Sequence, residues 1–183
     1  QADGQLNKSI DLLSRHLAEK PTASLVRQRL IEAYLDSDNI DRALAAANAG
    51  VELDPSSPVW HQRLGDLHIR ANNDVGKGVQ SYLAAMQRDP NVQLLLRIDE
   101  VTRTTQSLPN QELLEMARGP IAKMHPVVGA IEAKALQNLG RNRDALIAMK
   151  NSWNMFQYAI SKSWISPQSM SAWYLDMQTL FMD

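Results

Sequence analysis

Four prolines divide this chain into segments of nearly equal length. They lie 34, 35 and 36 residues apart, at Pro21, Pro55, Pro90 and Pro126. Between them, segments of turn-forming residues recur with nearly the same period, at 36–39, 71–74, 107–110 and 139–142. Because proline and turn residues interrupt helices, each period holds two helical segments and two turns. The chain is therefore predicted to repeat a helix-turn-helix unit.

The spacing of apolar residues within the segments indicates α-helix. Leu25, Leu30 and Tyr34 recur as on one face of a helix, and the alanine-rich run that follows has high helix propensity. Asp38 and Asn39 precede that run and are expected to cap its free amide groups. The alternation of Val, Ile and Thr that is typical of strands is absent. The predicted fold class is all-α.

Residues at fixed places in these units resemble the tetratricopeptide repeat. That family places Trp, Leu-Gly and Tyr on its first helix, a small residue and an aromatic on its second, and Pro at the end. The second unit has Trp60, Leu64, Gly65, Gly78, Tyr82, Ala85 and Pro90. The first unit has Leu30, Tyr34, Ala43, Ala47, Gly50 and Pro55. The small residues are expected to let paired helices approach closely. Trp60 lies one residue early, and His68 replaces the family's tyrosine.

The resemblance implies a right-handed α-solenoid of antiparallel helix pairs, about ten helices in all. A single helix pair cannot bury both faces, so neighbouring units share one elongated core. The expected parts are a lone helix of a truncated repeat at 4–20, repeats at 24–57, 58–90, 91–125 and 126–158, and a capping helix at 166–182. Gly119 and Pro120 should interrupt the second helix of the degenerate third repeat. The partner of the lone helix is expected upstream of Gln1.

Composition and motifs argue against several classes of function. The 19 basic and 20 acidic residues lack the basic excess of a nucleic-acid binder. There is no cysteine and no apolar run long enough to span a bilayer. The sequence is compatible with a location in the cytoplasm and with a periplasmic or exported one. No phosphate-binding loop or nucleophile elbow is present, so we expect no enzyme and no cofactor.

The histidines and paired acids are interpreted without a catalytic or metal role. His61 and His68 are seven residues apart, whereas metal-binding pairs on a helix are usually three or four apart. No third ligand has workable spacing, so no metal site is expected. His125 precedes Pro126 at a turn and is read as a solvated linker residue. Asp99 and Glu100 are read as part of a solvated helix face.

The resemblance also implies a groove lined by the first helix of each pair, in which a peptide or partner protein lies. Counting from the closing prolines gives the groove residues Gln28, Glu32, Gln62, Asp66, Arg97 and Val101, with Arg63 and Arg70 near the rim. The alternative is an ordinary hydrated helix face. Because Glu32 and Asp66 would repel a terminal carboxylate, we expect a basic or amide-rich ligand segment there, and acidic ligand groups toward Arg97.

Large apolar residues gather near the C-terminus, where seven of the ten aromatic residues fall between 153 and 181. The stripe comprises Met170, Trp173, Met177 and Phe181, with Trp164 preceding it. One reading is a cap on the core of the last repeat. The other is a self-association surface that forms a homodimer.

The function expected from all this is a non-catalytic scaffold that binds a protein or peptide. The alternative is a regulatory or targeting segment of a larger enzyme or secretion machine.

Overall fold

The computed structural model describes residues 2–72, 74–103, 105 and 107–167. These residues form nine α-helices and no strand, so the predicted all-α solenoid class is confirmed. They belong to two compact units, Gln1–Asp89 and Pro90–Asp183. None of the helices formed by the described residues combines the length and the hydropathy needed to cross a membrane.

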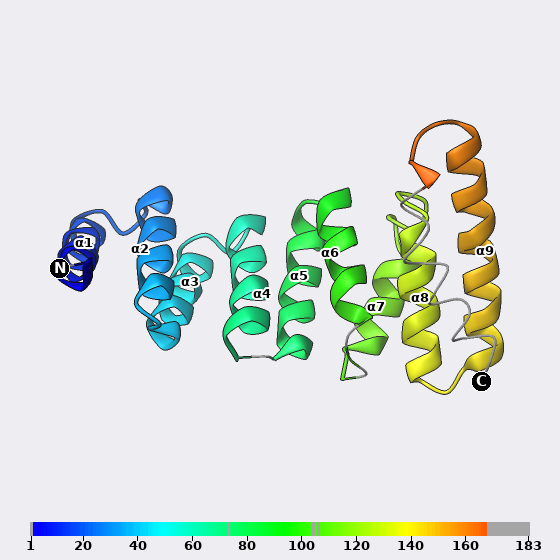
Figure 1. Ribbon diagram of the computed structural model, residues 1–183, viewed down its shortest axis with the longest axis horizontal. Helices are drawn as coiled ribbons and strands as arrows, with labels where there is room; N and C mark the ends of the chain where they lie inside the picture. The colour runs from blue at the N-terminus through cyan, green and yellow to red at the C-terminus, as the bar shows by residue number, and fades with distance from the viewer. Residues whose placement is uncertain (1, 73, 104, 106, 168–183) are drawn as a thin grey trace. The chain divides into compact units, whose positions relative to one another are not determined.

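The first unit is a row of five helices, each packed against the next (Figure 1). The helices are α1 (Ala2–Glu19), α2 (Ser24–Asp36), α3 (Ile40–Leu53), α4 (Pro58–Asn72) and α5 (Val75–Arg88). Short turns join them, so α2 with α3 and α4 with α5 form helix hairpins.

Local sequence explains where these helices begin. Pro58 is the first residue of α4, a position where its missing N–H costs nothing. The Asp74 side chain accepts a hydrogen bond from the Lys77 N–H at 3.1 Å and caps α5. The predicted cap of α3 was wrong: Asn39 makes no side-chain capping hydrogen bond. Asp38 takes a left-handed backbone conformation with φ of 54°, and the turn is closed by backbone hydrogen bonds instead.

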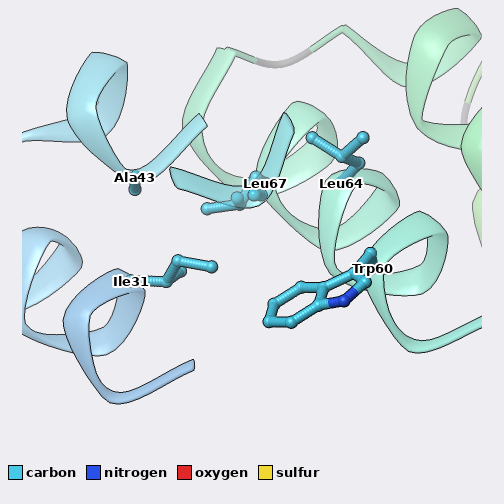
Figure 2. Packing of buried hydrophobic residues seen from close by; sticks show 6 residues of the cluster. Ile31, Ala43, Trp60, Leu64 and Leu67 are labelled. Atoms are coloured by element: carbon cyan, nitrogen blue, oxygen red, sulfur yellow. The ribbon is translucent and has the colours of Figure 1, made fainter. Parts of the chain in front are cut away.

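The core of unit 1 is a cluster in which three helices meet (Figure 2). Ile31 of α2 and Ala43 of α3 point toward Trp60, Leu64 and Leu67 of α4. All five are buried. Burying an aromatic or aliphatic side chain of this size stabilises the fold by about 1.5–3 kcal/mol. This shared cluster joins the first helix hairpin to the second, as expected for stacked repeats.

Glycines mark the closest approaches between helices. A Cβ atom on Gly65 of α4 would lie 2.3 Å from the Tyr82 ring of α5, and one on Gly50 of α3 would lie 2.5 Å from the Trp60 ring. A Cβ atom on Gly78 of α5 would lie 2.3 Å from the Ile69 side chain of α4 and 3.2 Å from the Gly65 carbonyl oxygen. The close packing predicted from the small residues is therefore confirmed at these positions.

The second unit contains α6 (Val92–Thr102), α7 (Asn110–Arg118), α8 (Val127–Asn138) and α9 (Asn142–Ser161). Within this unit α8 packs against α6, α7 and α9. The helix α7 ends immediately before Gly119 and Pro120, as those residues predict. Gly140, with φ of 73°, takes the left-handed conformation that ends α8. The predicted capping helix at 166–182 lies outside the described residues from 168 onward.

Candidate functional site

Six of the predicted partner-binding residues lie on the first helices of the two hairpins of unit 1. They are Gln28 and Glu32 on α2, and Gln62, Arg63, Asp66 and Arg70 on α4. Arg70 is exposed and the other five are half-buried. Buried residues of the same helices, among them Ile31 and Leu67, fix how α2 and α4 pack in the core. The six side chains therefore remain accessible at the surface.

Glu32 interacts with two guanidinium groups. Arg29 Nη1 lies 3.1 Å from Glu32 Oε2 within α2. Arg63 Nη2 on α4 lies 3.5 Å from Glu32 Oε1. The second ion pair links the first helices of successive hairpins. All three side chains are partly exposed, so each pair contributes on the order of 0–1 kcal/mol to stability. The negative charge of Glu32 is thus already offset within the protein.

Asp66 occupies the equivalent position on α4 but interacts with the neighbouring helix. The Tyr82 hydroxyl on α5 donates a hydrogen bond to Asp66 Oδ1 at 2.7 Å. The Tyr82 ring is buried over Gly65, which fixes the position of the hydroxyl. Asp66 therefore has a structural role at the junction of α4 and α5 in addition to any contact with a partner.

Arg97 and Val101 belong to α6 of the second unit. Arg97 is exposed and Val101 is half-buried. Their participation in one groove with the residues of unit 1 stays a prediction.

Sequence reasoning identified only part of a pattern on the exposed faces of α2, α4 and α6. Four sets of equivalent positions, 34 residues apart, lie on α2, α4 and α6 in that order. They are 25/59/93, 28/62/96, 29/63/97 and 32/66/100. The third position is Arg in every helix, and the fourth is Glu or Asp. None of these residues is buried. The members in unit 1, which we call the repeated face, are Leu25, Gln28, Arg29, Glu32, Val59, Gln62, Arg63 and Asp66.

The apolar members of the repeated face were missed because their spacing suggests burial. Leu25 was predicted to share a face with Leu30, but its side chain is 69% exposed. Leu25 and Leu30 are five residues apart, a separation that corresponds to about 140° around a helix, so the two side chains point in different directions. Val59, 34 residues after Leu25, is also exposed, at 45%. Comparing every position with its partner 34 residues on would have revealed the pattern.

Comparison with known proteins identifies the repeat. Residues 1–75 match the family model of the tetratricopeptide repeat. This part of the chain is therefore similar to tetratricopeptide repeats. Two solved structures titled as MamA share its fold, each with a TM-score of 0.54 and 14% sequence identity. The alignments cover 87% of this chain and 94% and 87% of the MamA chains. No curated protein matches the sequence.

Two residues of unit 2 differ from their predicted surroundings. His125 was read as a solvated linker, but it is half-buried, and its ring packs edge-on against Phe156 with centroids 6.1 Å apart. Burial lowers the pKa of His125. Asp99 was read as solvated, but it is buried in α6 and forms an ion pair with Arg103. Both readings were wrong because the sequence between Pro90 and Pro126 does not reveal which side chains are covered.

His68, which stands where the family has tyrosine, is held in a partly apolar place on α4. Its Nδ1 atom is buried, with no hydrogen-bond partner among the described residues. Burial lowers the pKa of His68, and Lys77 adds to that effect while Asp74 opposes it. Across the described part of the chain no three potential metal ligands cluster together.

The C-terminal part of unit 2 exposes an aromatic pair at the end of α9. The Tyr158 and Trp164 rings pack edge-on with centroids 5.6 Å apart, and Lys162 Nζ lies 5.6 Å from the Tyr158 centroid. Trp164 is 69% exposed. The rest of the predicted stripe, Met170, Trp173, Met177 and Phe181, lies outside the described residues. Both the capping and the homodimer interpretations stay predictions.

Proposed function

We propose that this chain is a non-catalytic scaffold that binds a partner protein along the repeated face of α2 and α4. Tetratricopeptide repeats are in general protein-interaction modules, which supports the coarse part of this proposal. The exposed residues of unit 1 support the proposed place and chemistry of binding.

The observation that carries the proposal is the recurrence of exposed apolar residues. Leu25 and Val59 occupy equivalent positions in successive repeats and are both exposed. A single exposed leucine is ordinary. Recurrence at equivalent exposed positions is different, because exposed side chains contribute little to packing. One turn further on, Gln28 and Gln62 recur as well, and each offers an amide that both donates and accepts hydrogen bonds.

The chemistry of the repeated face favours an uncharged ligand segment. Glu32 is already paired with Arg29 and Arg63, and Asp66 accepts the Tyr82 hydroxyl. A strongly basic segment would have to displace these contacts. We therefore favour the amide-rich alternative of the sequence prediction: an extended segment with apolar side chains against Leu25 and Val59. Its main-chain and side-chain amides would hydrogen-bond to the glutamines.

The experiment selects a ligand and then maps its site. Peptides are selected from a random displayed library on the full chain, and binding of a selected peptide is measured by calorimetry. Replacing both Leu25 and Val59 by Glu should weaken binding at least about tenfold, equivalent to about 1.4 kcal/mol. Leu12→Glu is the matched control, because Leu12 is an equally exposed leucine on α1. Equal affinities of the double variant and the control would refute the proposed site.

The salt dependence of the same binding separates the two ligand chemistries. An uncharged segment should bind with nearly the same affinity at about 50 and about 500 mM salt, since screening acts on charges. A basic segment held by Glu32 and Asp66 would lose most of its affinity over that range.

A further inference from the structure

A cleft of about 260 Å³ opens in unit 1 where the α1–α2 and α3–α4 turns lie close together. Pro21 and Asp54 come from these turns, and Arg27, Leu53 and Trp60 come from the adjoining helices. The cleft does not include any residue of the repeated face. Its volume lies below the usual 300–1,000 Å³ of sites for cofactors and drug-sized molecules, so it suits a group of about one residue.

Arg27 is the unusual member of this lining. It is only 8% exposed. Its guanidinium donates to the Pro21 carbonyl at 2.8 Å and to the Ala46 carbonyl at 3.4 Å. A guanidinium carries five N–H donors, so these two hydrogen bonds leave donors that can serve a ligand. Both acceptors are neutral, and among the described residues no carboxylate lies within ion-pair distance of Arg27.

A buried charge of this kind normally has a counter-ion. The other buried charged side chain in the described part of the chain, Asp99, is paired with Arg103. Asp54 lines the same cleft as Arg27, but its Oδ1 accepts the Ser56 hydroxyl at 2.7 Å. Burial lowers the pKa of Arg27, which is the expected effect of desolvating a cation.

We propose that this cleft binds a carboxylate group, to which Arg27 donates hydrogen bonds. Guanidinium and carboxylate match in geometry and charge, and such charge-assisted hydrogen bonds are the strong ones. Leu53 and the edge of Trp60 supply an apolar wall beside the charge, so a carboxylate attached to an apolar group fits best. In a polypeptide that group is either the C-terminal residue or an acidic side chain.

The test uses three small probes on the isotopically labelled full chain. N-acetyl-leucine represents a C-terminal carboxylate, and N-acetyl-glutamic acid α-amide represents a side-chain carboxylate. N-acetyl-leucinamide lacks the charge. Nuclear magnetic resonance follows the indole N–H of Trp60 and the amides of Thr22 and Ser24 during titration. At least one acid should shift these signals saturably with a Kd in the millimolar range, at least about tenfold more tightly than the amide. The tighter acid identifies the source of the carboxylate.

Two variants locate the site without removing Arg27, which also holds the turn through Pro21. Leu53→Asp places a negative charge at the cleft and should weaken acid binding at least about tenfold. Leu12→Asp, at an exposed leucine of α1 outside the cleft, should leave it unchanged. Asp54→Asn removes the competing carboxylate and should strengthen binding.

Three results would overturn the proposal. The first is equal binding of the acids and the amide, which would show that charge is not recognised. The second is equal loss in Leu53→Asp and Leu12→Asp, which would place the site elsewhere. The third is acid binding by Asp54→Asn alone, which would show that Asp54 itself occupies Arg27 in solution.

Discussion

The contact between α4 and α5 offers a sharp test of the packing described above. Gly65 and Gly78 face each other across this contact. A Cβ atom added at Gly65 would lie 2.3 and 2.4 Å from two atoms of the Tyr82 ring, and 3.1 Å from the Gly78 carbonyl oxygen. Tyr82 is almost fully buried, so its ring has little room to move. Gly65→Ala should therefore separate the two helices or expel the tyrosine.

The expected cost follows from three contributions. Overpacking a well-filled core costs typically about 1–3 kcal/mol. A displaced Tyr82 also loses its hydrogen bond to Asp66, and bonds to charged groups are worth about 1.5–3 kcal/mol. The higher helix propensity of alanine offsets about 1 kcal/mol. The net loss in the free energy of unfolding is then about 1.5–5 kcal/mol.

Urea denaturation followed by circular dichroism measures this loss. Gly4→Ala is the control, because nothing lies within 4 Å of a Cβ at that position of α1. It should be neutral or slightly stabilising. In a Tyr82→Leu background the cost of Gly65→Ala should fall by at least about 1 kcal/mol, since residues in contact are energetically coupled. A Gly65→Ala variant as stable as the wild type would refute the packing argument.

Two further predictions concern buried polar groups. Ser152 is fully buried, and its hydroxyl donates a hydrogen bond to the Pro126 carbonyl at 2.7 Å. Ser152→Ala should lower the free energy of unfolding by about 1–2 kcal/mol, because that carbonyl is left unsatisfied. An unchanged thermal midpoint would contradict this. Because burial lowers the pKa of His68 and His125, the unfolded chain binds more protons than the fold once the pH drops below about 6.5. Stability is then complete above that pH and lost on acidification. Thermal midpoints at about pH 7.5 and pH 5 should show this loss, and replacing both histidines by Gln should flatten it.

The helix hairpins of unit 1 were predictable because the information that specifies them is local and periodic. Gly50 and Gly65 stand at positions that the resemblance to the tetratricopeptide repeat marked, and in the structure helices approach closely at both, with Trp60 and Tyr82 filling the space beside them. The hairpins themselves were indicated by the period of the prolines and turn segments.

The wrong predictions concern residues whose environment the repeat pattern does not determine. Between Pro90 and Pro126 the markers found in the first two units are absent, and no pattern there indicates that Asp99 is covered or that His125 packs on Phe156. Caps also depend on backbone angles that composition does not determine. Asn39 has the residue type of a cap, but its side chain makes no capping hydrogen bond. The Arg27 cleft was missed because it joins two turns that are 33 residues apart, at Pro21 and Asp54.

The repeated face shows how function and stability can be separated in a repeat protein. The ion pair between Arg63 and Glu32 joins successive helices, so a structural reason exists for arginine and an acid to recur at these positions. Leu25 and Val59 take part in no such ion pair, and 69% and 45% of their surfaces are exposed. An apolar side chain that remains in water gains nothing from folding, because the hydrophobic contribution is proportional to the area removed from water. The partner that we propose would cover Leu25 and Val59 with its own surface, and this would explain why apolar residues recur at these two positions.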